Sequence, residues 1–312
     1  MAVKTVKMSP AEISRLYQRI KPFAVRETKP QYTYWQIRTE SGLTVTPYTS
    51  GKVVFQGNDL DFLESDGSAS PSSETGVSRK NGNREPSLTL SYPMAGSDEV
   101  GTGDFFGPIV TAAVIVENEE QARWLKSLHV TDSKAMNDEV IRKTAPLIEE
   151  KLCCSVRILS NPAYNDLHQK LGNIKMILAM QHNQAYLDLT EKGCALPGRV
   201  IVDQFCAPSS YFTYLKKAGV ENIIRNIHFE TRAESRYPAV AAASVLARYY
   251  FLKCMENLSE KYGIQISKGA GAPADQSGRK LLEQHSPSVL YECAKIHFAN
   301  MNKIGAGAYK EK

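Results

Sequence analysis

The sequence predicts an α/β fold for most of the chain, preceded by a smaller N-terminal domain. From residue 88 onward, short apolar runs typical of strands alternate with longer stretches of helical spacing, which indicates a sheet covered by helices. The 312 residues exceed the usual size of one domain. Hydrophobic residues make up 42% of the chain, which is enough for a packed core.

Residues 65–86 have the composition of a linker. They contain six serines, three glycines and almost no large apolar side chain, so they cannot bury enough surface to offset their ordering entropy. The alternative is a long mobile loop inside one domain, but structureless loops of this length are uncommon in compact domains. We therefore predict domains at residues 1–64 and 88–312, joined by a flexible linker at 65–87.

The N-terminal domain is predicted to be a helix followed by an antiparallel sheet. Ser9 and Glu12 have the spacing of a capping box, and apolar residues then recur at helical spacing as far as Ile20. Period-two alternation follows, which predicts strands within residues 32–37, 43–48 and 52–56.

The charge of this domain leaves two interpretations open. Residues 1–64 hold nine lysines and arginines against six acidic residues. The aromatic-rich sheet with Arg38 and Lys52 is either a platform for nucleic acid or an ordinary core-facing sheet with solvated charges. The pattern alone favours the ordinary sheet, because exposed charge is the normal state of a protein surface.

The elements of the larger domain follow from the positions of the apolar runs. Strands are predicted at residues 88–99, 108–116, 155–159 and 199–202. Helices are predicted at residues 118–128, 137–151, 161–189 and 237–262. Gly263 is expected to end the last of these helices.

Composition excludes several classes of protein. The six cysteines include no C-x-x-C pair, so we expect neither a disulfide framework nor a structural zinc site. No run approaches the roughly 18 apolar residues of a membrane span, and the N-terminus turns polar too early for a signal peptide. A cytoplasmic protein in a reducing compartment is expected. The net charge of +5 permits a polyanionic partner without requiring one.

Four acidic residues stand at positions that need an explanation. Asp98 and Glu99 end a predicted strand, Asp203 ends a short apolar strand, and Glu234 precedes the alanine-rich helix. An Asp-Glu pair alone is more typical of a solvated turn, but a charge that ends an apolar strand needs a reason. If these carboxylates converge, their oxygens suit Mg²⁺ or Mn²⁺ better than zinc. Two such ions can activate a water molecule for phosphodiester cleavage.

Several motifs extend this interpretation. The segment GSDEVGTGDFFGP at residues 96–108 resembles the opening motif of the type 2 ribonucleases H. The resemblance continues, in order, through TDSK at 131–134, Asn173, Lys175, His182-Asn183, IVD at 201–203 and ESRYPAVAAAS at 234–244. It covers roughly residues 90–300.

Within these enzymes the chain is more similar to the HIII branch than to the HII branch. HII enzymes typically have arginine and proline where this chain has Thr102 and Asp104, and usually aspartate in place of Glu234. Their late KGYG segment reads KGAG at residues 268–271. The segment YTSGKVVFQG at 48–57 resembles the N-terminal domain of HIII enzymes, which is related to TATA-binding protein.

The resemblance implies a ribonuclease H-like mixed sheet covered by helices, and cleavage of the RNA strand of an RNA/DNA hybrid to 5′-phosphate and 3′-hydroxyl ends. It implies two Mg²⁺ or Mn²⁺ ions with substrate. They are bound by the catalytic carboxylates Asp98, Glu99, Asp203 and Glu234. A monomer with no membrane and no obligate protein partner is expected. An HII-like enzyme that cuts at single ribonucleotides in DNA, or an inactive hybrid-binding protein, is the alternative.

The resemblance also implies contacts with nucleic acid. Backbone groups of Gly101, Thr102 and Gly103 are expected to lie against the RNA strand and sense its 2′-hydroxyls. Further contacts are implied for Ser133, Lys134, Tyr48, Ser50 and Lys52. Because the arginine and tyrosine of HII enzymes are missing, we expect efficient cutting within ribonucleotide stretches. Cutting beside a single embedded ribonucleotide should be weak.

Overall fold

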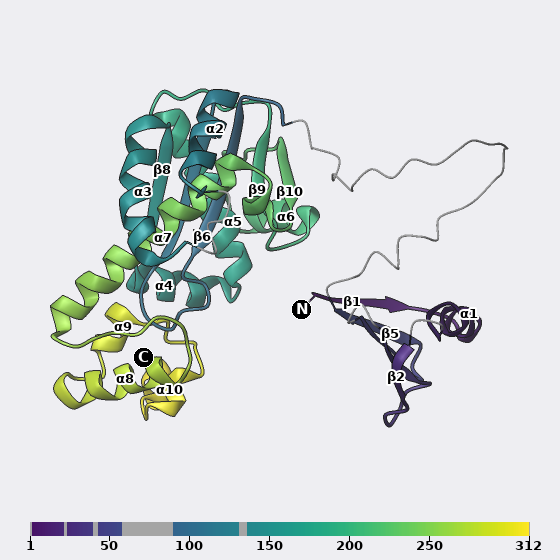
Figure 1. Cartoon of the computed structure of the whole chain (residues 1–312). Helices are drawn as coiled ribbons and strands as arrows, with labels where there is room; N and C mark the ends of the chain where they lie inside the picture. Colours follow the sequence, from purple (N-terminus) through teal and green to yellow (C-terminus); the bar gives the residue numbers. More distant parts are fainter. Residues whose placement is uncertain (1, 22–23, 40–42, 58–89, 131–135, 312) are drawn as a thin grey trace. The chain divides into compact units, whose positions relative to one another are not determined.

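The computed structural model divides the chain into two compact units, Met1–Arg84 and Glu85–Lys312 (Figure 1). The described residues are 2–21, 24–39, 43–57, 90–130 and 136–311. The predicted linker at 65–87 lies outside the described residues. Each of the two units has its own hydrophobic core.

The N-terminal unit is built on a five-stranded antiparallel sheet, in the order β1-β5-β4-β3-β2. Its elements are β1 (Ala2–Lys7), α1 (Pro10–Ile20), β2 (Ala24–Thr28), β3 (Gln36–Thr39), β4 (Thr44–Pro47) and β5 (Lys52–Gly57). The predicted helix and its capping box are confirmed, since the Glu12 backbone N–H donates to Ser9 Oγ and the Ser9 backbone N–H to Glu12 Oε2. The prediction of a helix followed by a sheet was incomplete, because β1 precedes the helix and pairs with β5.

One face of this sheet is covered by α1. Ile13, Leu16 and Ile20 are buried on the helix, where they pack in one cluster with the inward side chains of the sheet, Trp35, Ile37, Leu43, Val45, Val53 and Phe55. Burial of these apolar surfaces is what holds so small a unit together. The opposite face of the sheet has no helix from the described part of this unit against it.

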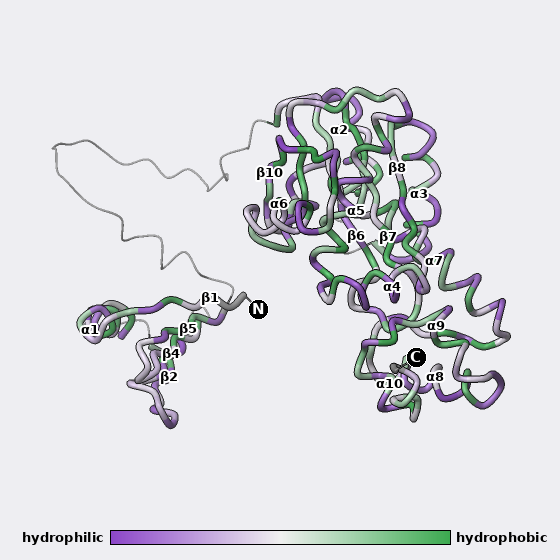
Figure 2. Tube along the Cα trace, turned by 180° about the vertical axis from the view of Figure 1, so that it is seen from behind, coloured by the Kyte–Doolittle hydropathy of each residue, from purple (hydrophilic) through white to green (hydrophobic). Residues whose placement is uncertain are grey.

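The larger unit contains a mixed sheet, as predicted. Its strands lie in the order β10-β9-β6-β7-β8, with β6 antiparallel to β7 and parallel to β9. The strands are β6 (Met94–Val100), β7 (Ile109–Val116), β8 (Cys154–Leu159), β9 (Val200–Asp203) and β10 (Ile227–Glu230). Strand β7 is buried along its whole length, and it is one of the hydrophobic stretches of this unit in Figure 2.

Helices cover both faces of the mixed sheet. α7 (Pro238–Tyr262) packs on one face, in a cluster with alternate side chains of β6 and β7. α5 (Ile174–Glu191) packs on the other face, against Ala95 and Ala113. The other helices are α2 (Glu119–Ser127), α3 (Asp138–Lys151), α4 (Asn161–Leu171), α6 (Pro208–Lys217), α8 (Ala272–Gln284), α9 (Val289–Cys293) and α10 (Asn300–Lys303), with 3₁₀ turns η4 (Ala233–Ser235) and η5 (Gly307–Glu311).

Two helix predictions are confirmed, one of them as two helices. The long alanine-rich helix is confirmed, and Gly263 ends it in the left-handed conformation with φ +65°. The helical region predicted at residues 161–189 is confirmed, and the chain divides it into α4 and α5. Gly172 ends α4 with φ +63°, and the Asn173 side chain caps α5 by accepting from the Lys175 backbone N–H at 2.9 Å.

One pair of cysteines is bonded, which was not anticipated from the sequence. Cys153, just before β8, forms a disulfide with Cys194, which follows α5. Cys154, Cys206 and two further cysteines are free. The pair was missed because 41 residues separate its members, and only the packing of α5 beside β8 brings them together.

Within the described residues, no helix combines the length and the apolar character that a membrane crossing requires.

Candidate active site

The ends of two parallel strands place Asp98 beside Asp203. Ser97 of β6 pairs with Val202 of β9, so the next step of the register sets the two aspartates next to each other. Side chains alternate along a strand, and Ile201 belongs to the cluster on the α7 face. Asp203 is two residues further along and therefore faces the same side. Asp98 does too, because its side chain hydrogen-bonds to Ser244 of α7.

The electrostatics of Asp98 reflect this neighbourhood. Burial raises the pKa of Asp98 well above its usual value, and the nearby carboxylates of Glu99 and Asp203 raise it further. Its hydrogen bonds with Ser244 and with the Glu99 backbone N–H, at 2.8 Å, act in the opposite direction. Gathered carboxylates oppose each other's ionisation, and a bound cation would remove that opposition.

Glu234 reaches the same neighbourhood from a different element. It lies in η4, directly ahead of α7, and is only 5% exposed. The backbone N–H of the preceding residue, Ala233, donates to Asp203 Oδ1 at 3.0 Å. This bond ties η4, and with it the backbone of Glu234, to the end of β9.

Glu230 is a further acid beside Asp203, but it is engaged elsewhere. The two residues pair in register between β10 and β9. The Glu230 carboxylate contacts His228 Nε2 at 3.0 Å, forms an ion pair with Arg236 and accepts from the Tyr237 hydroxyl at 3.2 Å. His228 and then Arg236 lower the pKa of Glu230, against the effect of its burial. The Glu230 carboxylate is therefore engaged in contacts with neighbouring side chains of the fold.

Glu99 points to the other face of β6, as alternation along a strand requires. Its Oε2 lies 2.9 Å from Nε2 of His182 on α5. The other ring nitrogen of His182, Nδ1, lies 2.8 Å from Ser97 Oγ. His182 and Ser97 are fully buried, whereas the Glu99 side chain is 14% exposed. The imidazole therefore holds the Glu99 carboxylate at the rim of the sheet.

His182 is the site residue that the sequence reasoning missed. It was noted as part of a motif, without a role. Phe205 stacks on its ring, with centroids 5.2 Å apart and planes at 18°, so packing orients the imidazole. The available signal was a lone histidine among the apolar residues of α5, a pattern more often explained by a satisfied core residue.

The donor set fits a hard divalent cation, but the described side chains do not form a complete coordination shell. Carboxylate oxygens are what Mg²⁺ and Mn²⁺ prefer. The strand ends set Asp98 beside Asp203, and η4, which carries Glu234, is bonded to the end of β9 through the Ala233 backbone N–H. Among the residues that the structure describes, no three acidic, histidine or cysteine side chains are grouped as a ready metal site. Glu99 is bonded to His182 instead.

The two glycines after Glu99, Gly101 and Gly103, differ in whether the fold leaves room for a side chain. Gly101 has φ +102°, and a Cβ there would lie 2.2 Å from the Pro108 carbonyl oxygen, so the fold itself demands glycine. A Cβ on Gly103 would meet nothing within 4 Å. Thr102 between them is half-buried. Gly103 therefore leaves its backbone open to an outside group.

The predicted contacts in the N-terminal unit are exposed. Tyr48 is 37% exposed, and Ser50 and Lys52 are exposed as well. Ser133 and Lys134 lie outside the described residues.

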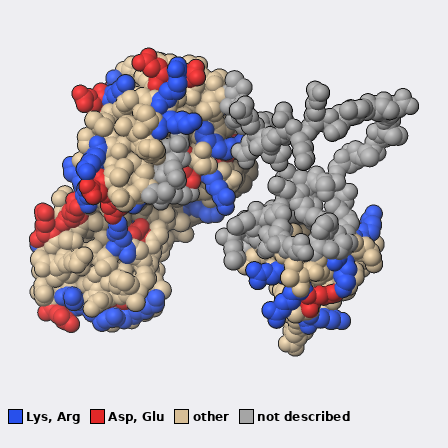
Figure 3. All heavy atoms as spheres, in the orientation of Figure 1, with Lys and Arg blue, Asp and Glu red and all other residues tan. Residues whose placement is uncertain are grey.

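The uncovered face of the N-terminal sheet carries facing pairs of like charge. Arg26 pairs in register with Arg38, and Lys7 with Lys52. All four side chains are exposed, and none of the described strand residues on this face is acidic. Like charges directly opposite each other destabilise a sheet. Basic residues are also prominent on the visible side of this unit in Figure 3.

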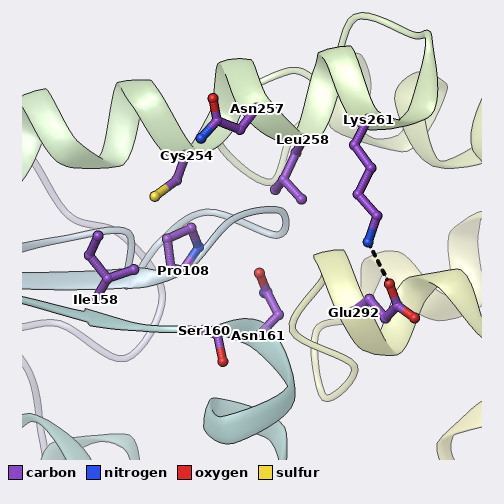
Figure 4. A pocket seen from close by; sticks show the side chains of 9 residues that line it. All are labelled: Pro108, Ile158, Ser160, Asn161, Cys254, Asn257, Leu258, Lys261 and Glu292. Carbon is purple, nitrogen blue, oxygen red and sulfur yellow. Dashed lines mark hydrogen bonds and ion pairs between the residues drawn. The ribbon is translucent and has the colours of Figure 1, made fainter.

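A separate cavity lies away from the carboxylates. It has a volume of about 230 Å³ between α7, the ends of β7 and β8, and α9. Ile158, Pro108 and Leu258 contribute apolar walls, and the Lys261–Glu292 ion pair spans α7 and α9 there (Figure 4). None of the predicted site residues lines this cavity.

Comparison with known proteins covers both units. A family model described as ribonuclease HII matches residues 95–301. A second model, described as a domain of unknown function (DUF3378), matches residues 4–63.

Curated relatives match over most of their length. A ribonuclease HIII of Geobacillus sp. (strain WCH70) is 38% identical, over 88% of this chain and 89% of that protein. One of Streptococcus thermophilus is 36% identical, over 97% and 98%.

Solved structures of related proteins resemble this chain over nearly its whole length. The crystal structure of Bst-RNase HIII in complex with Mn²⁺ has a TM-score of 0.67, at 34% identity and 99% coverage of both chains. RNase H3 of Aquifex aeolicus, 21% identical with a TM-score of 0.53, shares the fold. Because sequence and structure agree over nearly the whole chain, it belongs to the ribonuclease HIII family.

Proposed function

We propose that this ribonuclease hydrolyses the RNA strand of RNA/DNA hybrids at the ends of β6 and β9. Asp98, Glu99, Asp203 and Glu234 would bind divalent cations, Mg²⁺ or Mn²⁺, two per site with substrate. The observation that carries the proposal is the register of β6 and β9. It places Asp98 beside Asp203, in a setting that raises the pKa of Asp98.

Three of the four carboxylates have a distinct support in this proposal. Asp98 is held by Ser244, Asp203 by the Ala233 backbone N–H, and Glu99 by His182. These bonds limit the freedom of the side chains before any ligand arrives, which lowers the entropy cost of binding. When bound, the cations supply an activated water and stabilise the leaving oxygen.

The glycine loop, which is formed by residues 101–103, supports selectivity for RNA. Gly103 is exposed, and a Cβ at this position would meet nothing within 4 Å. Its backbone can therefore approach a sugar closely. A backbone amide or carbonyl at that position can hydrogen-bond to a 2′-hydroxyl, the group that distinguishes RNA from DNA. We propose that Gly101, Thr102 and Gly103 read the RNA strand in this way.

Digestion of a labelled hybrid tests the proposed function. With Mg²⁺ or Mn²⁺ we expect cuts confined to the RNA strand, with 5′-phosphate products, and no cleavage of single-stranded RNA or duplex DNA. Removal of the cations with a chelator should abolish cleavage, because carboxylates alone cannot activate water here. A duplex with a single embedded ribonucleotide should be cut weakly. Cleavage that survives chelation would contradict the metal-dependent mechanism, and equal rates on the two substrates would favour an HII-like enzyme.

The N-terminal unit is proposed to bind the duplex through the open face of its sheet. The facing pairs Arg26–Arg38 and Lys7–Lys52 repel each other in the free protein, and phosphate groups between them would relieve that repulsion. Tyr48 and Ser50, in the turn before β5, are proposed to contact the same ligand.

Removing two charges from this face should weaken hybrid binding and its salt dependence. For the double variant Arg38→Gln/Lys52→Gln, we expect the slope of log affinity against log salt to fall by about 0.9 for each lost phosphate contact. Fluorescence anisotropy with uncut hybrid, measured without divalent cations, gives the slope.

The matched control removes two charges from the helix side of the same unit. Arg15 and Lys21 lie on or next to α1, and both are exposed. Arg15→Gln/Lys21→Gln lowers the net charge equally and should leave the slope nearly unchanged. If the two double variants weaken hybrid binding equally, the net charge of the unit, and not the sheet face, is responsible for the affinity.

Two points remain predictions of the sequence. The monomeric state is one. Cytoplasmic location is the other.

A further inference from the structure

Lys295 is a fully buried lysine in the larger unit. Its side chain is 0% exposed, and it follows α9 near the C-terminal end of the chain. Burying a lysine is costly unless its N–H groups find partners, so a lysine at such a position needs an explanation.

The Lys295 amine binds the segment that follows the glycine loop. Nζ donates to the carbonyl oxygen of Asp104 at 2.9 Å and to that of Gly107 at 2.6 Å. The ring of Tyr164 lies 5.8 Å from Nζ. The Gly107 carbonyl also accepts from the Asn161 side chain at 2.9 Å.

Backbone bonds hold the same segment. The Lys295 backbone N–H donates to the Phe105 carbonyl at 2.8 Å, and the Gly107 N–H donates to the Cys293 carbonyl at 2.9 Å. On the other side, Asp104 Oδ1 accepts from the Gly269 backbone N–H at 2.5 Å. Residues 104–107 are therefore bound directly to the C-terminal part of the unit.

The glycine loop depends on this anchored segment for its position. Gly101 and Gly107 both have positive φ, so the backbone has a left-handed residue before the segment and another at its last residue. Gly103 is exposed, and a side chain there would meet nothing within 4 Å. The loop at 101–103 is thus placed by what holds Asp104 and Gly107.

We propose that Lys295 is a positioning residue that, by binding the carbonyls of Asp104 and Gly107, fixes the backbone of residues 101–103 against the RNA strand. This rests on the proposed function of that loop. Lys295 has no contact with substrate in this role. It acts on recognition of the 2′-hydroxyl through the main chain.

The role does not require the charge. Burial lowers the pKa of Lys295 to about 7, and Asp104 opposes this shift. A neutral amine keeps two N–H groups, which equals the number of carbonyls that Nζ binds. The two hydrogen bonds therefore persist on both sides of the titration.

The test compares Lys295→Met with wild type on two hybrids. One has an all-ribose strand, and the other lacks the 2′-hydroxyls next to the scissile phosphate. Methionine has a similar length and no donor. We expect kcat/KM on the all-ribose hybrid to fall on the order of tenfold to 10²-fold. The wild-type preference for the all-ribose hybrid should shrink toward one.

The preference ratio is independent of how much protein is folded, so it separates positioning from a loss of structure. Lys295→Gln keeps two N–H donors and should retain more of the preference than Lys295→Met. Lys280→Met, an exposed lysine on α8, should behave as wild type.

An unchanged ratio in Lys295→Met, with or without a lower rate, would overturn the inference. If wild type itself does not cleave the hybrid, the proposed function fails instead.

Discussion

Replacement of Asp203 by asparagine is expected to abolish cleavage while hybrid binding persists. The amide has the same size and keeps an oxygen that can accept from the Ala233 N–H, now at 3.0 Å. It is neutral, however, and binds a divalent cation far more weakly than a carboxylate does. A loss of at least about 10²–10³-fold in the single-turnover rate follows, since the cation provides the main electrostatic stabilisation.

Glu230→Gln is the matched control for Asp203→Asn. Glu230 pairs in register with Asp203 on the adjacent strand, but its carboxylate is bonded to His228, Arg236 and Tyr237. We expect this variant to cut at close to the wild-type rate. Normal cleavage by Asp203→Asn would refute the site assignment. An equal loss in Glu230→Gln would extend the ligand set to Glu230.

Gly96→Ala is expected to have the largest effect on stability. A Cβ at Gly96 would lie 2.4 Å from the Val240 backbone nitrogen and 2.7 Å from the Ala239 carbonyl carbon. These are backbone atoms at the start of α7 and cannot rotate away, so the helix or the strand must shift. Overpacking of this kind costs typically 1–3 kcal/mol, and we expect about 3 kcal/mol or more.

The same shift should reduce activity, because α7 carries Ser244, which bonds to Asp98. Urea unfolding of Gly96→Ala and Gly198→Ala measures the effect. Gly198 precedes β9, and a Cβ there meets nothing within 4 Å, so its variant should lie within about 0.5 kcal/mol of wild type. Equal unfolding midpoints for the two variants would mean that α7 does not press on β6 as described.

Local signals explain which elements were predictable. The capping box of Ser9 and Glu12 and the left-handed Gly263 act within a few residues of the helix ends they define. β1 was missed because its partner, β5, lies about 50 residues away and supplies the hydrogen bonds that make it a strand. The break at Gly172 was missed because an isolated glycine does not by itself end a helix.

The site was predictable in its residue types and not in its arrangement. The motifs around Asp98, Asp203 and Glu234 suggested a carboxylate cluster, and the parallel pairing of β6 with β9 sets the first two side by side. That Glu99 turns to His182 on the other face of the strand follows from side-chain alternation. The presence of an imidazole there follows only from the packing of α5.

The sequence by itself determined the helix caps, the strand and helix types of long periodic segments, and membership of the type 2 ribonucleases H, because these depend on neighbouring residues or on short motifs. Tertiary structure alone decided the Cys153–Cys194 bond, the contact of Gly96 with α7 and the burial of Lys295 under the loop at 104–107. Each joins residues that are far apart in the chain. Such pairings are selected by the burial of whole surfaces and carry no local pattern.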